Sequence, residues 1–274
     1  MFRRVGSPDP RLDVHGNTDF RLARQLRKYT KEDPPAQRVK PIPLSVITFL
    51  LGAAYSQPDE GFRGVADMLC IAFFFLMRPG EHNDNGNNQP FRLQDVKLHY
   101  NTVPVNWQIA TDADIDRTNA VSLVFTTQKN GVKGEVISHN QTGDPLTCPV
   151  KALVRRVKYL RGIGCSAATP LCTFVTNGRV LHMKPKTVTK TLRAGIIGID
   201  PHGTRLDIKP HEIDSRSLRA GGATALLCAG VDVNIIQLLG RWRSDAMIRY
   251  ASDMFAAGNY TFNPGWTVPA LPHD

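Results

Sequence analysis

Two strongly apolar segments follow residue 43. Residues 44–56 (LSVITFLLGAAYS) and 64–77 (GVADMLCIAFFFLM) carry few polar side chains, and each pattern predicts a helix. The second segment is apolar on nearly every face, so we expect it at the centre of the core. Its apolar run over 68–77 has ten residues, whereas a bilayer span needs roughly 20. The sequence therefore predicts a soluble protein with a buried central helix, and no association with a membrane.

The pattern changes after residue 77. Residues 78–90 are rich in Pro, Gly and Asn, which predicts a break in regular structure. Strands are expected over 91–100 and 120–128, and the Asn130-Gly131 turn leads into a third strand within 129–138. Helical patterns then return over 148–162, 186–196, 215–230 and 232–240, with a last helix from about Ser244 to Ala256. The expected fold class is α+β, mainly α with one small antiparallel sheet.

We expect three parts along the chain. Residues 1–40 are polar and charged, with the pair Pro34-Pro35, and are interpreted as a linker or the remnant of an upstream domain. Residues 41–257 form the main domain, and 258–274 a C-terminal tail rich in Gly, Asn and Pro. No internal repeat is visible.

Charge adds a class of partner. The chain has 34 Lys and Arg against 24 Asp and Glu, a net charge of +10. This excess indicates an anionic partner, most often nucleic acid, although a solvated basic surface would look the same. The five cysteines are odd in number and lack C-x-x-C spacing, so neither a disulfide framework nor a zinc site is expected. His182 and His211 have no paired ligand pattern either, and no cofactor or metal is predicted.

The most informative stretch is 215–252, SRSLRAGGATALLCAGVDVNIIQLLGRWRSDAMIRYAS. An arginine opens a helix of small residues, Ala-Gly-Val-Asp follows, and an apolar helix ends at Gly240 ahead of Trp242 and Tyr250. This order resembles the C-terminal half of the catalytic domain of tyrosine recombinases, the phage integrase family. The sequence Arg-Ala-Gly-Gly-Ala-Thr is most similar to that of recombinases of Crypton-type eukaryotic mobile elements. The resemblance implies the catalytic-domain fold of that family for 41–257, with 1–40 as a linker or the remnant of its DNA-clamping domain.

The resemblance also implies roles for single residues. Arg219 matches the arginine of the family's His-x-x-Arg pair, Trp242 its His/Trp position, and Tyr250 its nucleophile. Upstream, LMRPGEH matches the first-arginine motif and gives Arg78 and Glu81. The segment TTQKNG matches the sheet turn that carries a catalytic lysine, which gives Lys129, with Lys133 as the second choice.

Three departures stand beside these matches. Arg216 occupies the histidine position of His-x-x-Arg, and no histidine occurs between His211 and His273. Tyr250 follows Trp242 by eight residues, where the family usually has nine. About 40 residues precede the matching part, where the family carries a helical DNA-clamping domain.

The implied reaction is attack of Tyr250 on a phosphodiester of double-stranded DNA, without metal or ATP. Arg78 and Arg219 would clamp the phosphate, and Lys129 would protonate the leaving 5′-oxygen. Trp242 would donate its indole N–H to a phosphate oxygen. Glu81 would orient Arg78 or Arg216. The resemblance further implies a tetramer on DNA and a location in the nucleus, or otherwise in the cytoplasm. The 255–271 tail would dock on a neighbouring subunit, or alternatively fold back on its own domain.

Other readings stay open. The chain is alternatively a catalytically silent DNA-binding descendant of such an element, with Arg216 as the lesion, or a type IB topoisomerase. Tyr250 alone would be a packed helical tyrosine in most proteins, and Tyr260 is a weak rival nucleophile. Arg241, Arg243 and Arg249 are interpreted as contacts to the DNA backbone or as a solvated face.

Overall fold

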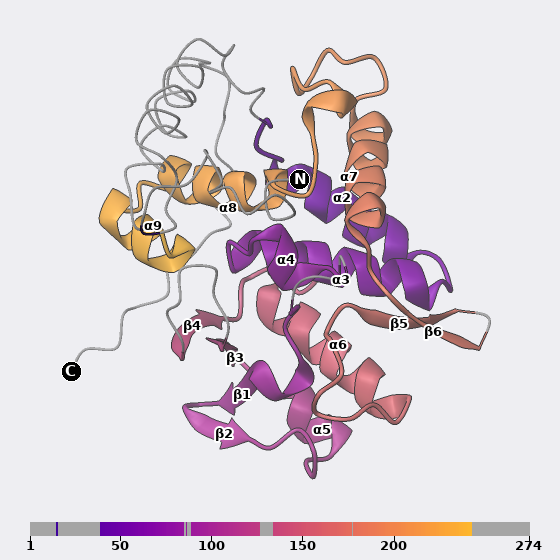
Figure 1. Ribbon diagram of the computed structural model, residues 1–274, viewed down its shortest axis with the longest axis vertical. Coiled ribbons are helices and arrows are strands. Elements are labelled where there is room, and N and C mark those ends of the chain that lie inside the picture. Colours follow the sequence, from indigo (N-terminus) through magenta and orange to yellow (C-terminus); the bar gives the residue numbers. More distant parts are fainter. Residues whose placement is uncertain are drawn as a thin grey trace. The chain divides into compact units, whose positions relative to one another are not determined.

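The computed structural model describes His15 and residues 39–84, 86, 89–126, 134–176 and 178–242. The chain divides into two compact units, Met1–Arg38 and Val39–Asp274, and the elements below belong to the second. Its described part is a mixed α+β structure with a small antiparallel sheet, as the sequence predicted (Figure 1). The main helices are α2 (Leu44–Tyr55), α3 (Glu60–Phe74), α6 (Pro149–Gly162), α7 (Pro185–Ile199), α8 (Ser217–Cys228) and α9 (Val233–Gly240).

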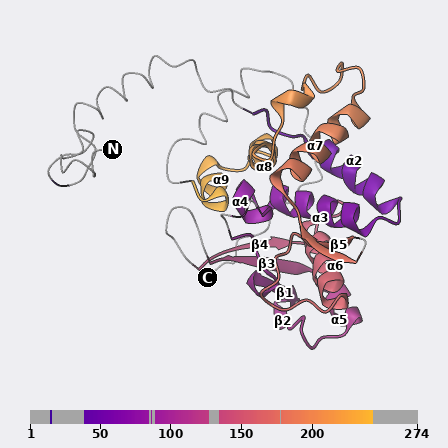
Figure 2. The ribbon, with the colours of Figure 1, turned by 45° about the vertical axis from the view of Figure 1, so that its right-hand side comes forward.

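Helix α3 is the centre of the core, as its apolar pattern predicted. Every residue from Gly64 to Phe74 is buried, including the acidic Asp67. Figures 1 and 2 show α2, α7 and α8 on one side of α3, with α6 and the sheet on the other. Asp67 is stabilised there by Arg155 of α6, whose Nη2 donates to its Oδ1 at 2.6 Å, and by the hydroxyl of Tyr55 at 2.7 Å. No helix among the described residues is both long and apolar enough to cross a membrane.

The Gly-Gly pair of α8 permits backbone-to-backbone packing. A Cβ on Gly222 would overlap the carbonyl oxygen of Phe73 in α3, and one on Gly221 would overlap the carbonyl oxygen of Ile42. Any larger side chain would push α8 away from the central helix. Close helix packing therefore explains the two glycines of the Arg-Ala-Gly-Gly motif, and this packing positions the start of α8.

The sheet has the strand order β2-β1-β3-β4, all neighbours antiparallel. Its strands are β1 (Val96–Tyr100), β2 (Val103–Val105), β3 (Ala120–Phe125) and β4 (Glu135–Asn140). Val121, Leu123 and Phe125 of β3 are buried, and Phe125 pairs with Glu135 at the last described position of the β3–β4 ladder. The predicted turn at Asn130-Gly131 lies outside the described residues.

Several short elements differ from the prediction. The 91–100 segment begins with a 3₁₀ turn, Leu93–Asp95, because the Asp95 carboxylate accepts from the Arg92 backbone N–H at 2.8 Å. The expected break after residue 77 contains a one-turn helix, α4 (Pro79–His82), and α5 (Asp112–Asp116) was not foreseen. A second, two-stranded sheet joins β5 (Thr173–Thr176) to β6 (Arg179–His182), so the prediction of a single sheet was wrong. Neither strand, with the sequences TFVT and RVLH, alternates strictly between apolar and polar residues, so the pattern did not mark them.

Candidate functional site

Arg78 is positioned by the sharp end of α3. Leu76 adopts a left-handed conformation (φ 47°), which turns the chain so that Arg78 becomes the N-cap of α4. The Glu81 carboxylate reaches back and accepts from the Arg78 backbone N–H at 2.7 Å and from its Nη1 at 3.2 Å. Pro79 follows with a fixed φ that suits the first helical position. One carboxylate thus fixes both the backbone and the side chain of Arg78, which matches the alternative in which Glu81 orients Arg78.

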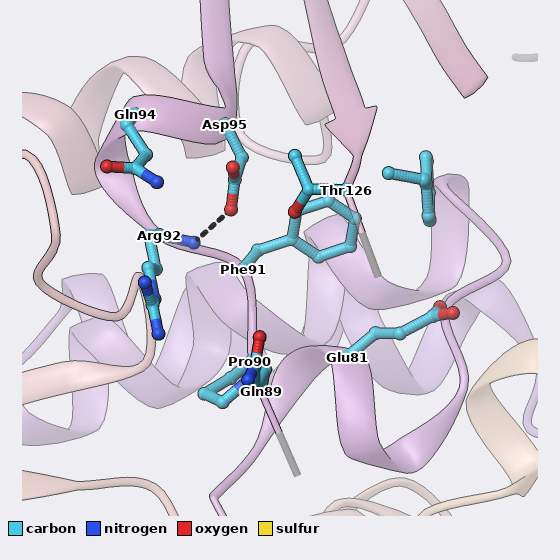
Figure 3. Close-up of a pocket in the computed structure, with 9 residues that line it drawn as sticks. Glu81, Gln89, Pro90, Phe91, Arg92, Gln94, Asp95 and Thr126 are labelled. Carbon is cyan, nitrogen blue, oxygen red and sulfur yellow. Dashed lines mark hydrogen bonds between the residues drawn. The ribbon is translucent and has the colours of Figure 1, made fainter. Parts of the chain in front are cut away.

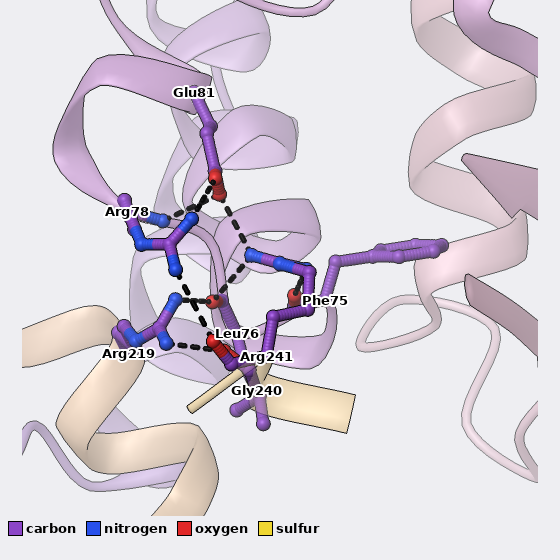
Figure 4. A network of polar contacts seen from close by, with 7 residues as sticks. All are labelled: Phe75, Leu76, Arg78, Glu81, Arg219, Gly240 and Arg241. Atoms are coloured by element: carbon purple, nitrogen blue, oxygen red, sulfur yellow. Dashed lines mark hydrogen bonds and ion pairs between the residues drawn. The ribbon is translucent and has the colours of Figure 1, made fainter. Parts of the chain in front are cut away.

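Arg219 reaches the same place from α8. Its Nη1 donates to the Leu76 carbonyl at 2.9 Å, and its Nη2 donates to the Gly240 carbonyl at the end of α9. Arg78 donates through Nη2 to the next carbonyl, that of Arg241, at 3.2 Å. Figure 4 shows the two guanidinium groups one above the other, beside the backbone of 240–241. The two arginines, far apart in sequence, are therefore brought to the same short segment, because they bind the neighbouring carbonyls of Gly240 and Arg241.

Trp242 completes this cluster. The Arg219 Cζ lies 4.1 Å from the centroid of the Trp242 ring, a cation–π arrangement. The ring packs against Gly240, where a Cβ would overlap its six-membered edge. Gly240 is therefore required by the indole beside it, and the indole holds the face of Arg219.

Arg241 corrects the interpretation as a DNA contact or solvated residue. Its side chain is only 1% exposed, and its Nη2 binds Glu81 Oε2 at 2.8 Å. The guanidinium Cζ lies 3.6 Å from the centroid of the Phe125 ring. Burial lowers the pKa of Arg241 to about 10, opposed by the nearby Glu81. The sequence did contain a signal that Arg241 belongs to the site. Arg241 directly follows Gly240 and precedes Tyr250 by nine residues, the spacing that the resembling family usually has between its His/Trp position and its tyrosine.

Arg216 lies apart from Glu81. It is the N-cap residue of α8, its side chain is 61% exposed, and its guanidinium forms a two-point ion pair with Asp214. Nη2 and Nε donate to Asp214 Oδ2 at 2.7 and 3.0 Å. The alternative in which Glu81 orients Arg216 is therefore wrong. Arg216 is oriented by its own loop, one helical turn before Arg219.

A shallow groove lies along α7 and beside this loop. It is lined by the exposed Lys186 and Lys190, one helical turn apart, and by Asp214 and Ser215. Arg193 closes its lining and donates through Nε to the Ile213 carbonyl at 3.0 Å. Lys186 and Lys190 thus place exposed positive charge in a groove beside the loop that precedes Arg216.

A small cavity connects Glu81 with the sheet (Figure 3). It is lined by Glu81, Phe125, Thr126 and the 3₁₀ turn with Asp95, and it encloses about 30 Å³, enough for a water molecule but not for a ligand. Burial raises the pKa of Asp95. The lining links Glu81 to Thr126, the last described residue before 127–133.

The remaining predicted residues lie outside the described part of the chain: Lys129, Lys133, Arg243, Arg249, Tyr250 and Tyr260. Within the part that is described, no group of three or more His, Cys, Asp or Glu side chains could hold a metal ion. Comparison of the chain with protein-family models and with curated proteins finds no match.

Proposed function

We propose that this protein cleaves and rejoins DNA strands as a tyrosine recombinase, and that its α+β domain has the catalytic fold of that family. One observation carries the proposal. Arg78 binds the carbonyl of Arg241, Arg219 binds those of Leu76 and Gly240, and Arg241 precedes Tyr250 by nine residues. Two planar guanidinium groups side by side match the non-bridging oxygens of a phosphodiester.

The proposed reaction conserves the energy of the broken bond. The Tyr250 oxygen attacks the scissile phosphorus and forms a 3′-phosphotyrosyl bond, while the bond to the 5′-oxygen breaks. The tyrosine gives up its proton, and Lys129 supplies a proton to the leaving oxygen, which becomes a free 5′-hydroxyl. Attack by a 5′-hydroxyl on the phosphotyrosine reverses the step and rejoins the strands. Arg78 and Arg219 stabilise the negative charge of the phosphoryl transition state, commonly the largest contribution to such catalysis.

A nicked suicide substrate tests this proposal. A short 5′-terminal fragment that diffuses away after cleavage traps the phosphotyrosyl adduct, which migrates as a larger species on a denaturing gel. We expect the adduct with the wild type and with Tyr260→Phe, and none with Tyr250→Phe. Tyr260 is a matched control because it is a tyrosine in the same C-terminal region. An adduct that persists in Tyr250→Phe, or none with the wild type, would contradict the proposal.

The Arg216–Asp214 ion pair favours a second candidate, a DNA-binding protein that does not cleave. Arginine cannot act as a proton acceptor near neutral pH, and here the Nε and Nη2 of Arg216 are directed to Asp214. A silent descendant would bind duplex DNA and give no adduct. An adduct in Arg216→His but not in the wild type would decide for this candidate.

A further inference from the structure

Arg241 is an unusual residue for its position. It ends α9 in the left-handed conformation (φ 58°, ψ 41°), where glycine is favoured and other residues are strained. Its charged side chain is nevertheless buried. A buried, strained arginine costs free energy unless its partners compensate, so the contacts that it makes explain its presence.

These contacts concentrate on Glu81 and the end of α3. Arg241 Nη2 binds Glu81 Oε2 at 2.8 Å and the Leu76 carbonyl at 3.2 Å, and Nη1 lies 3.4 Å from the Phe75 carbonyl. Arg78 binds the same carboxylate, and its Nη2 binds the carbonyl of Arg241 itself. Arg241 is therefore linked to Arg78 in two ways. Both side chains bind the carboxylate of Glu81, and the backbone carbonyl of Arg241 accepts a hydrogen bond from Arg78.

The charges of this group do not cancel in pairs. Glu81 carries one negative charge and lies between two arginines, Arg78 and Arg241, with Arg219 bound to the same Leu76 carbonyl. Were Arg241 neutral, Glu81 would offset the charge of Arg78 almost completely. With Arg241 present, the carboxylate holds Arg78 in place and the cluster keeps an excess of positive charge.

We propose that Arg241 is a positioning residue that takes up the charge of Glu81, so that the carboxylate orients Arg78 without neutralising it. This inference rests on the proposed function, because that function supplies the phosphate oxygen that Arg78 would bind. It also connects that arginine to the sheet, since the guanidinium of Arg241 stacks on Phe125, at the end of β3 that leads to Lys129.

Inorganic phosphate is the probe for this proposal, because its binding requires no cleavage. Phosphate is titrated into the full-length protein at low salt while the Arg78 side-chain Nε–H and the Trp242 indole N–H are followed by NMR. Arg241→Met keeps an unbranched side chain of similar reach but removes the charge. We expect it to weaken phosphate binding by about 10-fold, since Glu81 then offsets Arg78.

A second variant separates this role from simple loss of structure. Glu81→Gln/Arg241→Met removes both charges and restores the net charge of the cluster. We expect it to recover phosphate affinity to within about threefold of wild type, a rescue that a merely structural role would not produce. Arg156→Met is the matched control, because Arg156 is a buried arginine bound to the carbonyls of Leu171 and Thr173. It should lower stability and leave phosphate binding unchanged.

The outcomes separate this inference from the proposed function. Wild-type affinity in Arg241→Met, no recovery in the double variant, or no phosphate binding by the wild type would overturn the role of Arg241. If Arg241→Met does not fold, the comparison is made between Glu81→Gln/Arg241→Met and the wild type, and affinity lost in that folded variant overturns the inference. Adduct formation on nicked DNA is scored separately. Rescue without any adduct would keep the inference and reject the recombinase, whereas an adduct without rescue would do the reverse.

Discussion

The guanidinium of Arg219 stacks on the indole of Trp242, with Cζ 4.1 Å from the ring centroid. The indole in turn packs on Gly240, whose carbonyl accepts from Arg219. Arg219 is thus held on its face by an aromatic ring and at its edge by two carbonyls, those of Gly240 and Leu76. This arrangement leaves little freedom for its side chain and makes it a pre-organised donor.

Trp242→Ala should slow adduct formation by about 10-fold or more, because Arg219 loses the ring that orients it. Trp242→Phe keeps an aromatic face but not the indole N–H. We expect it to lie between wild type and Trp242→Ala in single-turnover assays on nicked DNA. A Phe variant as slow as the Ala variant would assign the role to the N–H alone, and equal rates in all three proteins would contradict any role for this residue.

Gly222→Ala should lower the free energy of unfolding by roughly 2–3 kcal/mol, because the new Cβ overlaps the Phe73 carbonyl and forces α8 from α3. Gly52→Ala is the control. Gly52 is exposed within α2 with nothing near its missing Cβ, so alanine should raise stability by about 0.5–1 kcal/mol. Urea unfolding measures both. Similar effects of the two changes would show that the close packing of α8 on α3 does not limit stability.

Arg216→His should preserve or raise the rate of adduct formation, because histidine can both bind the phosphate and exchange a proton near neutral pH. Arg216→Ala should lower the rate without abolishing DNA binding. Rates are measured across roughly pH 6–9, because a histidine with a pKa of about 6.5 loses its charge in the lower part of this range. Asp214→Asn removes the ion pair that now holds Arg216, so it should change the rate only while Arg216 is present. An identical effect of Asp214→Asn in Arg216→Ala would exclude action through Arg216.

Binding to duplex DNA should weaken linearly in log affinity as log salt rises, because bound lysines and arginines release counterions. Lys186→Ala and Lys190→Ala, in the groove along α7, should each reduce the salt slope by about 1. Lys158→Ala is the control, since Lys158 is already paired with Asp116 at 2.7 Å. Fluorescence anisotropy over a salt series measures the slopes. A slope unchanged in both groove variants would place the DNA elsewhere on the surface.

Stability should fall in acid because His82 and His139 are buried as neutral side chains. Burial lowers the pKa of each to about 4, below the ordinary histidine value of 6.5. Between pH 6.5 and 4 the unfolded chain therefore binds protons at these histidines and the folded chain does not. The free energy of unfolding has its full value above pH 6.5. It falls by roughly 3 kcal/mol per histidine as the pH drops toward 4.

Urea unfolding between these pH values checks the sign. His82→Gln and His139→Gln should each reduce the loss of stability in acid, although either change also costs packing at neutral pH. His139 packs edge-on against Phe75, with centroids 4.5 Å apart, so its replacement should cost more. His99→Gln, at a partly exposed site, serves as the control. An unchanged acid loss in both buried-site variants would refute the assignment.

Much of the fold followed from local pattern. The apolar run of 64–77 determined a buried central helix, because no face of it could remain in water at low cost. The helices at 44–56, 148–162 and 232–240 were predicted to within a residue at each end. The fold class, an α+β structure with a small antiparallel sheet, was also correct. The short strands of 173–182 were missed, since neither TFVT nor RVLH alternates strictly between apolar and polar residues.

Only the tertiary structure decided the geometry of the site. The sequence suggested Arg78, Glu81, Arg219 and Trp242 by their order. It could not say which carbonyls the two arginines would bind, because these contacts join segments far apart along the chain. It assigned Arg241 to the surface, since charged side chains usually avoid burial. Burial was decided by the partners that tertiary packing supplies: the carboxylate of Glu81, the carbonyls that end α3 and the ring of Phe125. For Arg216, the nearby Asp214 supplied a partner that pattern alone did not reveal.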